Sequence, residues 1–376
     1  MNSCLLVKNK TNLFKFDNLL DKNIKVNNSN IKIYINEQYN FNFFKELKDD
    51  NDINVSIYNS SDNKYKIVIK KFKNNDLFTK ESSIINIFSK NKICNKYVIN
   101  NYSLEKDKYV LMSYGDGDLY DLFKNENIVK KSLYNALFIF QKIIICYNCI
   151  YKNLNLIYTD IKLQNIVWKC EIDSHDIKIL LIDFGAFNFK NDKYKEYTFP
   201  SIHLLKSNIL TIKETVYQLG ILFINILLLF FESKKIISGG EYQDIVKKYI
   251  NINLLSMANM KLIGGGNSMN NSTSNTMNNT MNNTMNNSIN ISNSGFVPGF
   301  LQNINNTTNN FEDSELKNYL KPFIDEIKKI LESKNFNTNI INEIITLINK
   351  CIEFNPEERF DLDQLESKIK YILNIY

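Results

Sequence analysis

The chain has 376 residues, 44% of them apolar, which is long and apolar enough to bury a sizeable core. Its net charge of +6 comes from lysines spread along the whole chain and not from a basic block. A mild excess of positive charge favours phosphorylated ligands or acidic partners, but none of the nucleic-acid-binding motifs is present. We therefore expect a globular protein that does not bind nucleic acid.

The cysteines and the most apolar segments bear on the cellular compartment. The six cysteines are scattered, and the first residues, MNSCLLVKNK, hold no apolar run long enough for a signal peptide, so we expect an intracellular protein. Cys146 and Cys149 form a CxxC without a second pair, which favours packing inside a helix over a zinc site. The apolar run from Leu219 to Phe231 is shorter than the about 20 residues that span a bilayer. It predicts a buried core helix, and we expect no membrane contact.

The first third of the chain carries strand patterns. The first fifty residues are polar, with one expected strand at Ile31–Ile35. Apolar and polar residues then alternate on both sides of NSSDN, a cluster of turn formers, so residues 54–72 predict a β-hairpin. A helix is expected around Thr79–Ser89, followed by two strands in YVINNYSL and KYVLMSY. This part should be a small, mostly antiparallel sheet with one helix.

The remainder is mainly helical, which makes the expected fold class α+β. Apolar residues recur at three- and four-residue spacing after SYGDGD, and short strands are expected at NIVW and IKILLI. From Gly264 to Asn310 the sequence is mostly Asn, Ser, Thr and Met, and such a segment buries too little apolar surface to fold, so it predicts a disordered insert. The predicted divisions are 1–53 (a divergent N-terminal segment that could belong to the sheet of the next part), 54–114 (β-rich), 115–263 (helical), 264–310 (the insert) and 311–376 (terminal helices).

Four polar side chains suit phosphoryl transfer from ATP, namely Lys70, Asp160, Asn165 and Asp183. That reaction needs positioned metal ions, a cation on the phosphates and a carboxylate at the nucleophile. In YTDIKLQN, Asp160, Lys162 and Asn165 follow one another at intervals of two and three, and IDFGAF supplies Asp183. Any one of these residues alone is most often a turn or cap residue. Their order along the chain is what gives them weight together.

Several segments, in this order, resemble those of the eukaryotic-type protein kinases: IVIKK, VLMSYGDGDLYDLF, YTDIKLQN, IDFGAF, TVYQLGILFINIL and CIEFNPEERFDLDQL. The resemblance runs from about residue 54 to residue 375, apart from the Asn-rich insert. It implies a bilobal fold with a small antiparallel β-rich N-lobe and a larger, mainly α C-lobe. The last two segments lie outside the active site of that family, so a single shared motif does not explain the match.

The resemblance implies ATP and Mg²⁺ as cofactors and a protein hydroxyl as the substrate. Asp160 would accept or orient the proton of that hydroxyl, and Lys162 would steady the transferred phosphoryl group. Asn165 and Asp183 would hold Mg²⁺, which prefers hard oxygen ligands. A lysine two residues past the aspartate is the pattern of serine/threonine kinases, which is the function implied. A pseudokinase that binds or scaffolds, and a kinase for a small molecule, stay open as alternatives.

The nucleotide side of the site is also implied by the resemblance. Lys70 would hold the α- and β-phosphates; strand alternation does not decide between Lys70 and Lys71, but the frame IVIK favours Lys70. Glu81 would be its ion-pair partner, although the helix would have to be short, and a surface role for Glu81 stays open. The adenine-binding segment would be Met112, Ser113 and Tyr114, with Met112 at the gatekeeper position.

The sequence departs from the kinase pattern in the segment before Lys70 and in the catalytic loop. No glycine precedes Gly115, so the glycine-rich loop over the phosphates is absent and we expect weaker nucleotide binding. Tyr158 and Thr159 replace the histidine and arginine of the HRD motif. Tyr158 can substitute as a packing residue with a polar tip. Thr159 has no charge to pair with a phosphate, which predicts activity without loop phosphorylation.

Residues around the expected site also depart from the kinase pattern. YTFPSIHLL stands where an APE motif is expected, so Arg359 should lack its usual buried partner. Thr215 stands at the position of the usual aspartate of the central helix, with Glu214 beside it. Thr198 is either the threonine next to the substrate or a loop residue. These departures concern residues that support the fold more than residues that would take part in phosphoryl transfer.

Overall fold

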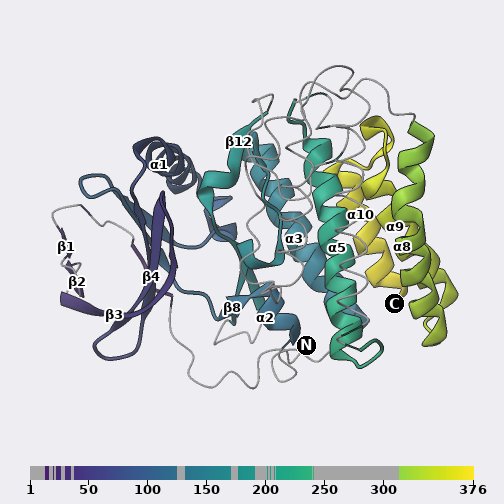
Figure 1. Ribbon diagram of the computed structural model, residues 1–376, viewed down its shortest axis with the longest axis horizontal. Helices are drawn as coiled ribbons and strands as arrows, with labels where there is room; N and C mark the ends of the chain where they lie inside the picture. Colours follow the sequence, from purple (N-terminus) through teal and green to yellow (C-terminus); the bar gives the residue numbers. More distant parts are fainter. Residues whose placement is uncertain are drawn as a thin grey trace, which may run out of the picture.

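The computed structural model describes residues 38–124, 132–170, 177–190, 209–238 and 313–376, with short stretches between residues 13 and 34 and single positions between 201 and 240. The described part is mixed α+β, as the sequence predicts. A curled sheet with one helix lies at one side and most of the helices lie at the other (Figure 1). The predicted Asn-rich insert, 264–310, and Thr198 lie outside the described residues.

The largest sheet is antiparallel and seven-stranded, in the order β1-β2-β3-β4-β5-β7-β6. Its strands are β1 (Ile24–Val26), β2 (Asn30–Tyr34), β3 (Gln38–Asp49), β4 (Ile53–Ser60), β5 (Lys66–Phe72), β6 (Asn101–Leu104) and β7 (Tyr109–Ser113). The hairpin predicted for residues 54–72 is β4 and β5, and the predicted strand near Ile31 is β2. β3 was not predicted. Its register shifts twice against β4, around Phe44 and Leu47, and these bulges break the alternation that identifies a strand.

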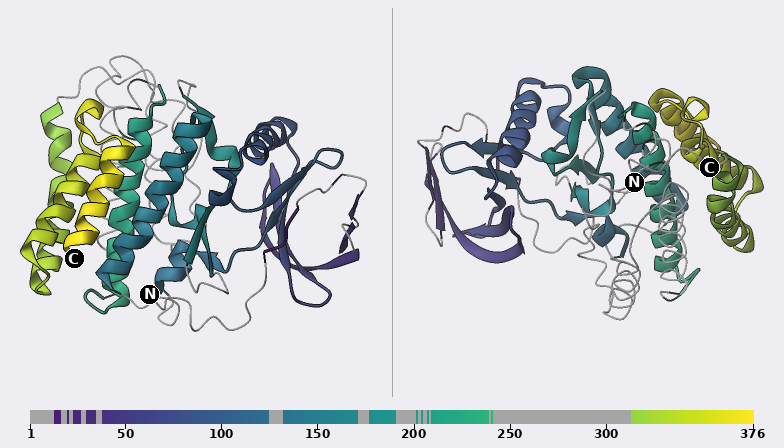
Figure 2. Two further views of the ribbon diagram at one scale, coloured as in Figure 1. Left: turned by 180° about the vertical axis from the view of Figure 1, so that it is seen from behind. Right: turned by 45° about the horizontal axis from the view of Figure 1, so that its top comes forward.

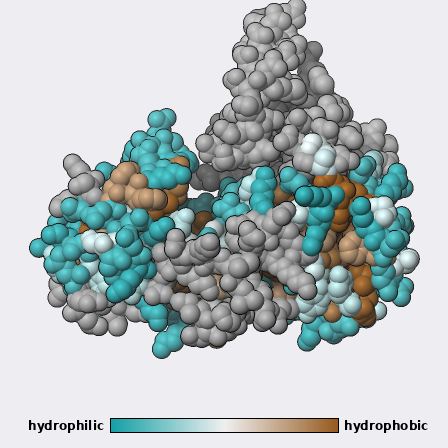
Figure 3. Space-filling view, turned by 90° about the horizontal axis from the view of Figure 1, so that it is seen from below, coloured by the Kyte–Doolittle hydropathy of each residue, from teal (hydrophilic) through white to brown (hydrophobic). Residues whose placement is uncertain are grey.

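The two faces of this sheet are buried against different parts of the chain. The outer face packs on Phe14 and Phe16, and the Phe14 ring meets Phe41 and Tyr65 edge to face at 5.2 and 5.4 Å between centroids. The other face belongs to the main core through residues such as Val110. The residues before β1 are therefore part of the sheet's own packing. Figure 3 shows that hydrophilic residues cover most of the described surface on the face it views.

Helix α1 (Asn75–Lys90) confirms the helix predicted around Thr79–Ser89. It begins after Asn74, whose side-chain oxygen accepts a hydrogen bond from the Asp76 amide at 2.9 Å and so caps the first turn. Its buried side chains recur at three- and four-residue spacing and face the sheet. Phe88 meets Phe184 edge to face at 5.7 Å, which links this helix to the loop that carries Asp183.

The helical part is built around two long helices, α3 (Leu133–Leu154) and α5 (Ile212–Ser233), and includes α2 (Leu119–Lys124), α8 (Asp313–Ser333), α9 (Thr338–Ile352) and α10 (Leu362–Ile375). Both long helices are apolar and long enough to cross a membrane, but 94% of the most apolar stretch of α5 is buried inside the structure. The run Leu219–Phe231 is thus a core helix, as predicted. At Gly220 an added Cβ would lie 2.6 Å from the Cys351 Cβ, so glycine lets α5 approach α9.

Two small sheets lie between the large sheet and the helices (Figure 2). One contains β8 (Gly117–Asp118), β10 (Ile166–Cys170) and β11 (Ile177–Leu181), and the other pairs β9 (Leu156–Tyr158) with β12 (Phe187–Phe189). The strands expected at NIVW and IKILLI are β10 and β11. Together these short strands hold the two loops in which the candidate catalytic residues lie.

The CxxC lies on α3. Cys146 is buried, and the thiol of Cys149 lies 2.8 Å from that of Cys94. No group of three or more His, Cys, Asp or Glu side chains that could hold a metal occurs among the described residues. The position of Cys146 agrees with core packing inside the helix, which the sequence favours.

Candidate active site

Two loops carry most of the predicted catalytic residues, and strand pairing fixes both ends of each. Residues 159–165 join β9 to β10, and residues 182–186 join β11 to β12. Tyr158 is paired with Phe187 at one end, and Ile166 with Leu181 at the other. Two backbone bonds also join the loops, from the Ile182 amide to the Asn165 carbonyl at 3.1 Å and from the Thr159 amide to the Ala186 carbonyl at 3.1 Å. The loops therefore lie side by side.

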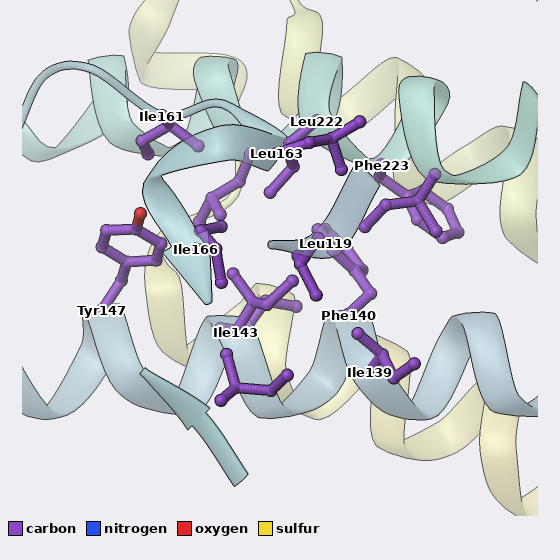
Figure 4. Packing of buried hydrophobic residues seen from close by; sticks show 14 of the residues in the cluster. Leu119, Ile139, Phe140, Ile143, Tyr147, Ile161, Leu163, Ile166, Leu222 and Phe223 are labelled. Carbon is purple, nitrogen blue, oxygen red and sulfur yellow. The ribbon is translucent and has the colours of Figure 1, made fainter. Parts of the chain in front are cut away.

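Apolar residues anchor the first loop in the core. Ile161, Leu163 and Ile166 are buried, and Figure 4 shows them among side chains of α3 and α5. The Ile161 amide also donates to the side-chain oxygen of Gln218 on α5 at 3.4 Å. With these anchors in the core, Asp160 keeps 21% of its side chain exposed and Lys162 keeps 38%. Both remain accessible to a ligand.

Asp160 is held by two donors from its own loop. Its Oδ2 lies 2.6 Å from Lys162 Nζ and 2.6 Å from Asn165 Nδ2, and Asn165 Nδ2 also donates to the Asp160 carbonyl at 2.9 Å. Within the described part of the chain, no group donates to Oδ1 of Asp160. The three residues predicted from YTDIKLQN are therefore in direct contact, with one carboxylate oxygen left to accept a proton or a hydrogen bond.

Lys70 joins the sheet to α1 and to the second loop. Its Nζ lies 2.6 Å from Glu81 Oε2 and 3.0 Å from Asp183 Oδ1, so the predicted ion pair with Glu81 is present. Lys71 is exposed, with its Nζ 5.7 Å from the centre of the Tyr109 ring. The choice of Lys70 over Lys71 as the inward lysine is confirmed.

Burial and charge oppose each other in this cluster. Burial alone would lower the pKa of Lys70, but the negative charges of Asp183 and Glu81 outweigh it and raise that pKa. For Asp183 burial acts in the other direction and would raise the pKa, but the charge of Lys70 holds that pKa below its usual range. For Glu81 burial prevails, and its pKa is raised. Lys70 therefore stays protonated and is the cation of the site.

The backbone at Asp183 is shaped for this contact. Asp183 adopts a left-handed conformation, with φ of 63°, which a residue other than glycine rarely takes and which concentrates at functional sites. Two residues later, an added Cβ at Gly185 would lie 3.3 Å from Glu81 Oε2 and 3.7 Å from Asp183 Oδ1. Glycine at this position leaves room for the three charged groups.

Tyr158 and Thr159 act as neutral ties between the loops. The Tyr158 hydroxyl donates to the Ile182 carbonyl at 2.9 Å, and burial raises the pKa of this phenol well above its usual value. Thr159 Oγ1 donates to the Ala186 carbonyl at 2.9 Å and accepts from Asn188 Nδ2 at 3.1 Å. Tyr158 thus combines packing with a hydrogen bond, as the sequence predicts.

The predicted adenine-binding segment is divided between the two faces of the sheet. Met112 is buried in the main core, on the face of Lys70. The Ser113 hydroxyl instead donates to the Phe14 carbonyl, in the packing of the outer face. The Tyr114 amide donates to the Lys66 carbonyl at 3.2 Å. Met112 therefore shares the face of Lys70, and the Ser113 side chain does not.

Arg359 is paired with a residue that the sequence did not predict as its partner. Arg359 has a buried partner, since its Nη1 lies 3.8 Å from Oε2 of Glu214 and both side chains are almost fully buried. Glu214 also accepts hydrogen bonds from the Ser201 amide at 2.8 Å and the Ser201 hydroxyl at 2.5 Å. The first turn of α5 thus supplies the carboxylate that the missing APE motif does not. Gln218, one turn later on α5 and bonded to the Ile161 amide, was also missed, because a glutamine in an apolar helix gives no distinctive signal.

Asp183 and Asn165 are the residues that fit Mg²⁺. That ion is typically held by one or two carboxylates, waters and substrate phosphates, so a cluster of three acidic side chains is not required. The Asp183 side chain is 36% exposed although one of its oxygens is bonded to Lys70. Asn165 donates through Nδ2, which leaves its amide oxygen as a hard ligand. Their hard oxygen donors are of the kind that this ion prefers.

The site joins residues from four separate parts of the chain, on β5, on α1 and in the two loops. No protein-family model and no curated protein matches this sequence.

Proposed function

We propose that this protein is an ATP-dependent serine/threonine protein kinase. The observation that carries the proposal is the contact of Lys70 Nζ with both Glu81 and Asp183, beside a loop in which Lys162 and Asn165 hold Asp160. A buried cation, an accessible carboxylate and a hard-oxygen pair are the parts that phosphoryl transfer requires.

The arrangement of the elements supports a bilobal protein-kinase-like fold. In this proposal the seven-stranded sheet and α1 form the N-lobe, and the helices around α5 form the C-lobe. The carboxylate of α1 meets the lysine of a central strand, and the loops with Asp160 and Asp183 lie beside them. This similarity extends over the sheet order, α1 and the central helix α5. It is the basis for assigning the nucleotide to the space between the two parts.

The chemistry follows from the side chains of the site. Lys70 would bind the α- and β-phosphates through its ammonium, and Asn165 and Asp183 would hold Mg²⁺, which neutralises phosphate charge when bound. The substrate hydroxyl oxygen forms a bond to the γ-phosphorus while the bond from that phosphorus to the ADP oxygen breaks. The hydroxyl proton passes to Oδ1 of Asp160, and Lys162, next to it, steadies the transferred group.

A pseudokinase is the second candidate function. One observation favours it, the absence of any glycine in the turn between β3 and β4, where kinases cover the phosphates. A kinase for a small molecule is less favoured, since such enzymes usually lack a lysine at the position of Lys162.

Phosphoryl transfer separates these functions. Purified protein is incubated with γ-labelled ATP, Mg²⁺ and a mixture of acidic and basic proteins, beside an Asp183→Asn variant. We expect label on serine and threonine of the protein mixture with the native chain and none with the variant. Equal transfer by both chains would show a contaminant, and transfer by neither would favour the pseudokinase.

A further inference from the structure

Three amides of the turn between β3 and β4 already have hydrogen-bond partners within the chain. Asp50 Oδ1 accepts hydrogen bonds from the Ile53 amide at 2.8 Å and from the Asp52 amide at 3.0 Å. The Asp50 amide itself donates to the Ile53 carbonyl at 3.0 Å. A glycine-rich turn binds phosphate through such N–H groups. Here the Asp50 carboxylate already accepts from two such groups, so we look for another group to meet the phosphates on this side.

Strand register brings a lysine of β3 to the face of Lys70. Lys48 is paired with Val55 of β4, Val55 with Lys70 of β5, and Lys70 with Val110 of β7. Residues directly opposite one another in an antiparallel sheet share a face, so Lys48 and Lys70 emerge on the same side. The bulge at Leu47 produces this register, because it shifts β3 by one residue just before Lys48.

Lys48 thus shares a face of the sheet with the cation of the site. On that face Lys70 is in contact with Glu81 and Asp183. The β3–β4 hairpin therefore adds a second lysine on the side of the sheet from which Lys70 reaches Asp183.

Lys48 is free to exchange its partner. Its side chain is 58% exposed, and its Nζ lies 2.6 Å from Asp50 Oδ2, whose side chain is 40% exposed. An exposed ion pair of this kind contributes little to stability, so replacing a carboxylate by a phosphate at the ammonium is easily achieved. The hydrogen bond from Lys48 lowers the pKa of Asp50 to about 2, so this carboxylate is charged at neutral pH.

We propose that Lys48 is a phosphate-binding residue for ATP, which takes over with its ammonium the contact that a glycine-rich turn would make with backbone amides. The inference rests on the proposed function. In the absence of nucleotide Asp50 holds Lys48, and on binding the ammonium moves to the phosphates while Asp50 keeps the turn closed through Oδ1.

Equilibrium binding of ATP and of adenosine, both with Mg²⁺, tests the role of Lys48. Lys48→Met should weaken ATP binding about tenfold, as expected for one charge-assisted hydrogen bond, and leave adenosine binding unchanged. Lys48→Arg should stay close to the native chain, and so should Lys71→Met, which removes a lysine from the opposite face. Asp50→Asn keeps an oxygen for the turn but releases Lys48, so it should tighten ATP binding.

Each outcome has one meaning. Equal ATP binding by the native chain and Lys48→Met would overturn the role of Lys48 and leave the kinase proposal standing. Equal weakening of ATP and adenosine would also overturn it, because the effect would then be structural. A native chain that binds adenosine and ATP equally well would contradict both the kinase proposal and the inference. Thermal unfolding of each variant verifies that it is folded.

Discussion

Lys70 and Glu81 form a buried ion pair, 2.6 Å from Nζ to Oε2, that joins the central part of the sheet to α1. Glu81 is 1% exposed and its Oε1 has no hydrogen-bond partner in the described part of the chain, so its charge depends on this lysine. The pair therefore determines stability as well as the position of the cation.

Lys70→Met should be strongly destabilising. Removing the lysine leaves a buried carboxylate without its cation, which typically costs about 3 kcal/mol of unfolding free energy. Urea unfolding measures this loss. Lys71→Met is the matched control on the exposed face, and it should change stability by less than about 0.5 kcal/mol. A similar loss in both variants would mean that the ion pair is not the cause.

Gly220→Ala should destabilise the helical part. The new Cβ would lie 2.6 Å from the Cys351 Cβ and 2.9 Å from Ile352 Cγ2, so α5 and α9 must move apart. Overpacking of a well-packed core costs about 1–3 kcal/mol. Gly185→Ala is the comparison, because its Cβ would meet only the ends of the Glu81 and Asp183 side chains, and it should affect phosphoryl transfer more than stability. An unchanged unfolding midpoint for Gly220→Ala would contradict the close packing of α5 on α9.

The buried pair of Arg359 and Glu214 gives a prediction about pH. Burial raises the pKa of Glu214, and the charge of Arg359 opposes that rise. In Arg359→Met the folded-state pKa should rise further above the unfolded value. A carboxyl group with a raised folded pKa stabilises fully below its unfolded pKa, and that stability is lost as the pH rises through the folded pKa. The stability deficit of Arg359→Met against the native chain should therefore shrink as the pH falls from 7 towards about 4.5.

Thermal unfolding of the two chains across this pH range measures the effect. Arg359→Lys, which keeps the charge, should show a smaller deficit and less pH dependence. A deficit that is constant with pH would mean that lost packing, and not the charge of Glu214, dominates.

The proposed kinase should not require phosphorylation for activity. Thr159 makes neutral hydrogen bonds to the Ala186 carbonyl and Asn188, where an arginine would bind a phosphate. Phosphatase treatment of the purified protein should leave its rate of phosphoryl transfer unchanged. Thr159→Val should lower that rate. It should also lower the free energy of unfolding by about 1 kcal/mol, for the lost hydrogen bond. A rate that disappears after phosphatase treatment would contradict this role of Thr159.

Local spacing was enough to predict the central part of the site. The intervals within YTDIKLQN put Asp160, Lys162 and Asn165 in one short loop, and their mutual contacts need only that loop to close. The core helix over Leu219–Phe231 could be predicted because Asn225 is the one polar residue in its apolar run. The ordered motifs also identified Lys70 as the inward lysine, where alternation alone could not.

The remainder depends on contacts that sequence patterns do not record. β3 was missed because two bulges break its alternation, and the same bulges put Lys48 on the face of the sheet that carries Lys70. The orientation of Ser113 depends on Phe14, which lies 99 residues earlier in the chain. Glu214 becomes the partner of Arg359 only through the packing of α5 against the C-terminal segment. Register and long-range packing are therefore what the structure adds.

In the proposed function, Asp160 serves phosphoryl transfer to a protein hydroxyl. The most direct measurement is the initial rate at which γ-labelled phosphate reaches serine and threonine in a protein mixture, for the native chain, Asp160→Asn and Lys71→Met. We expect transfer by the native chain and Lys71→Met, and a rate at least about 100-fold lower for Asp160→Asn, the usual contribution of a positioned base. Equal rates for the native chain and Asp160→Asn, or no transfer by the native chain, would contradict the proposed function.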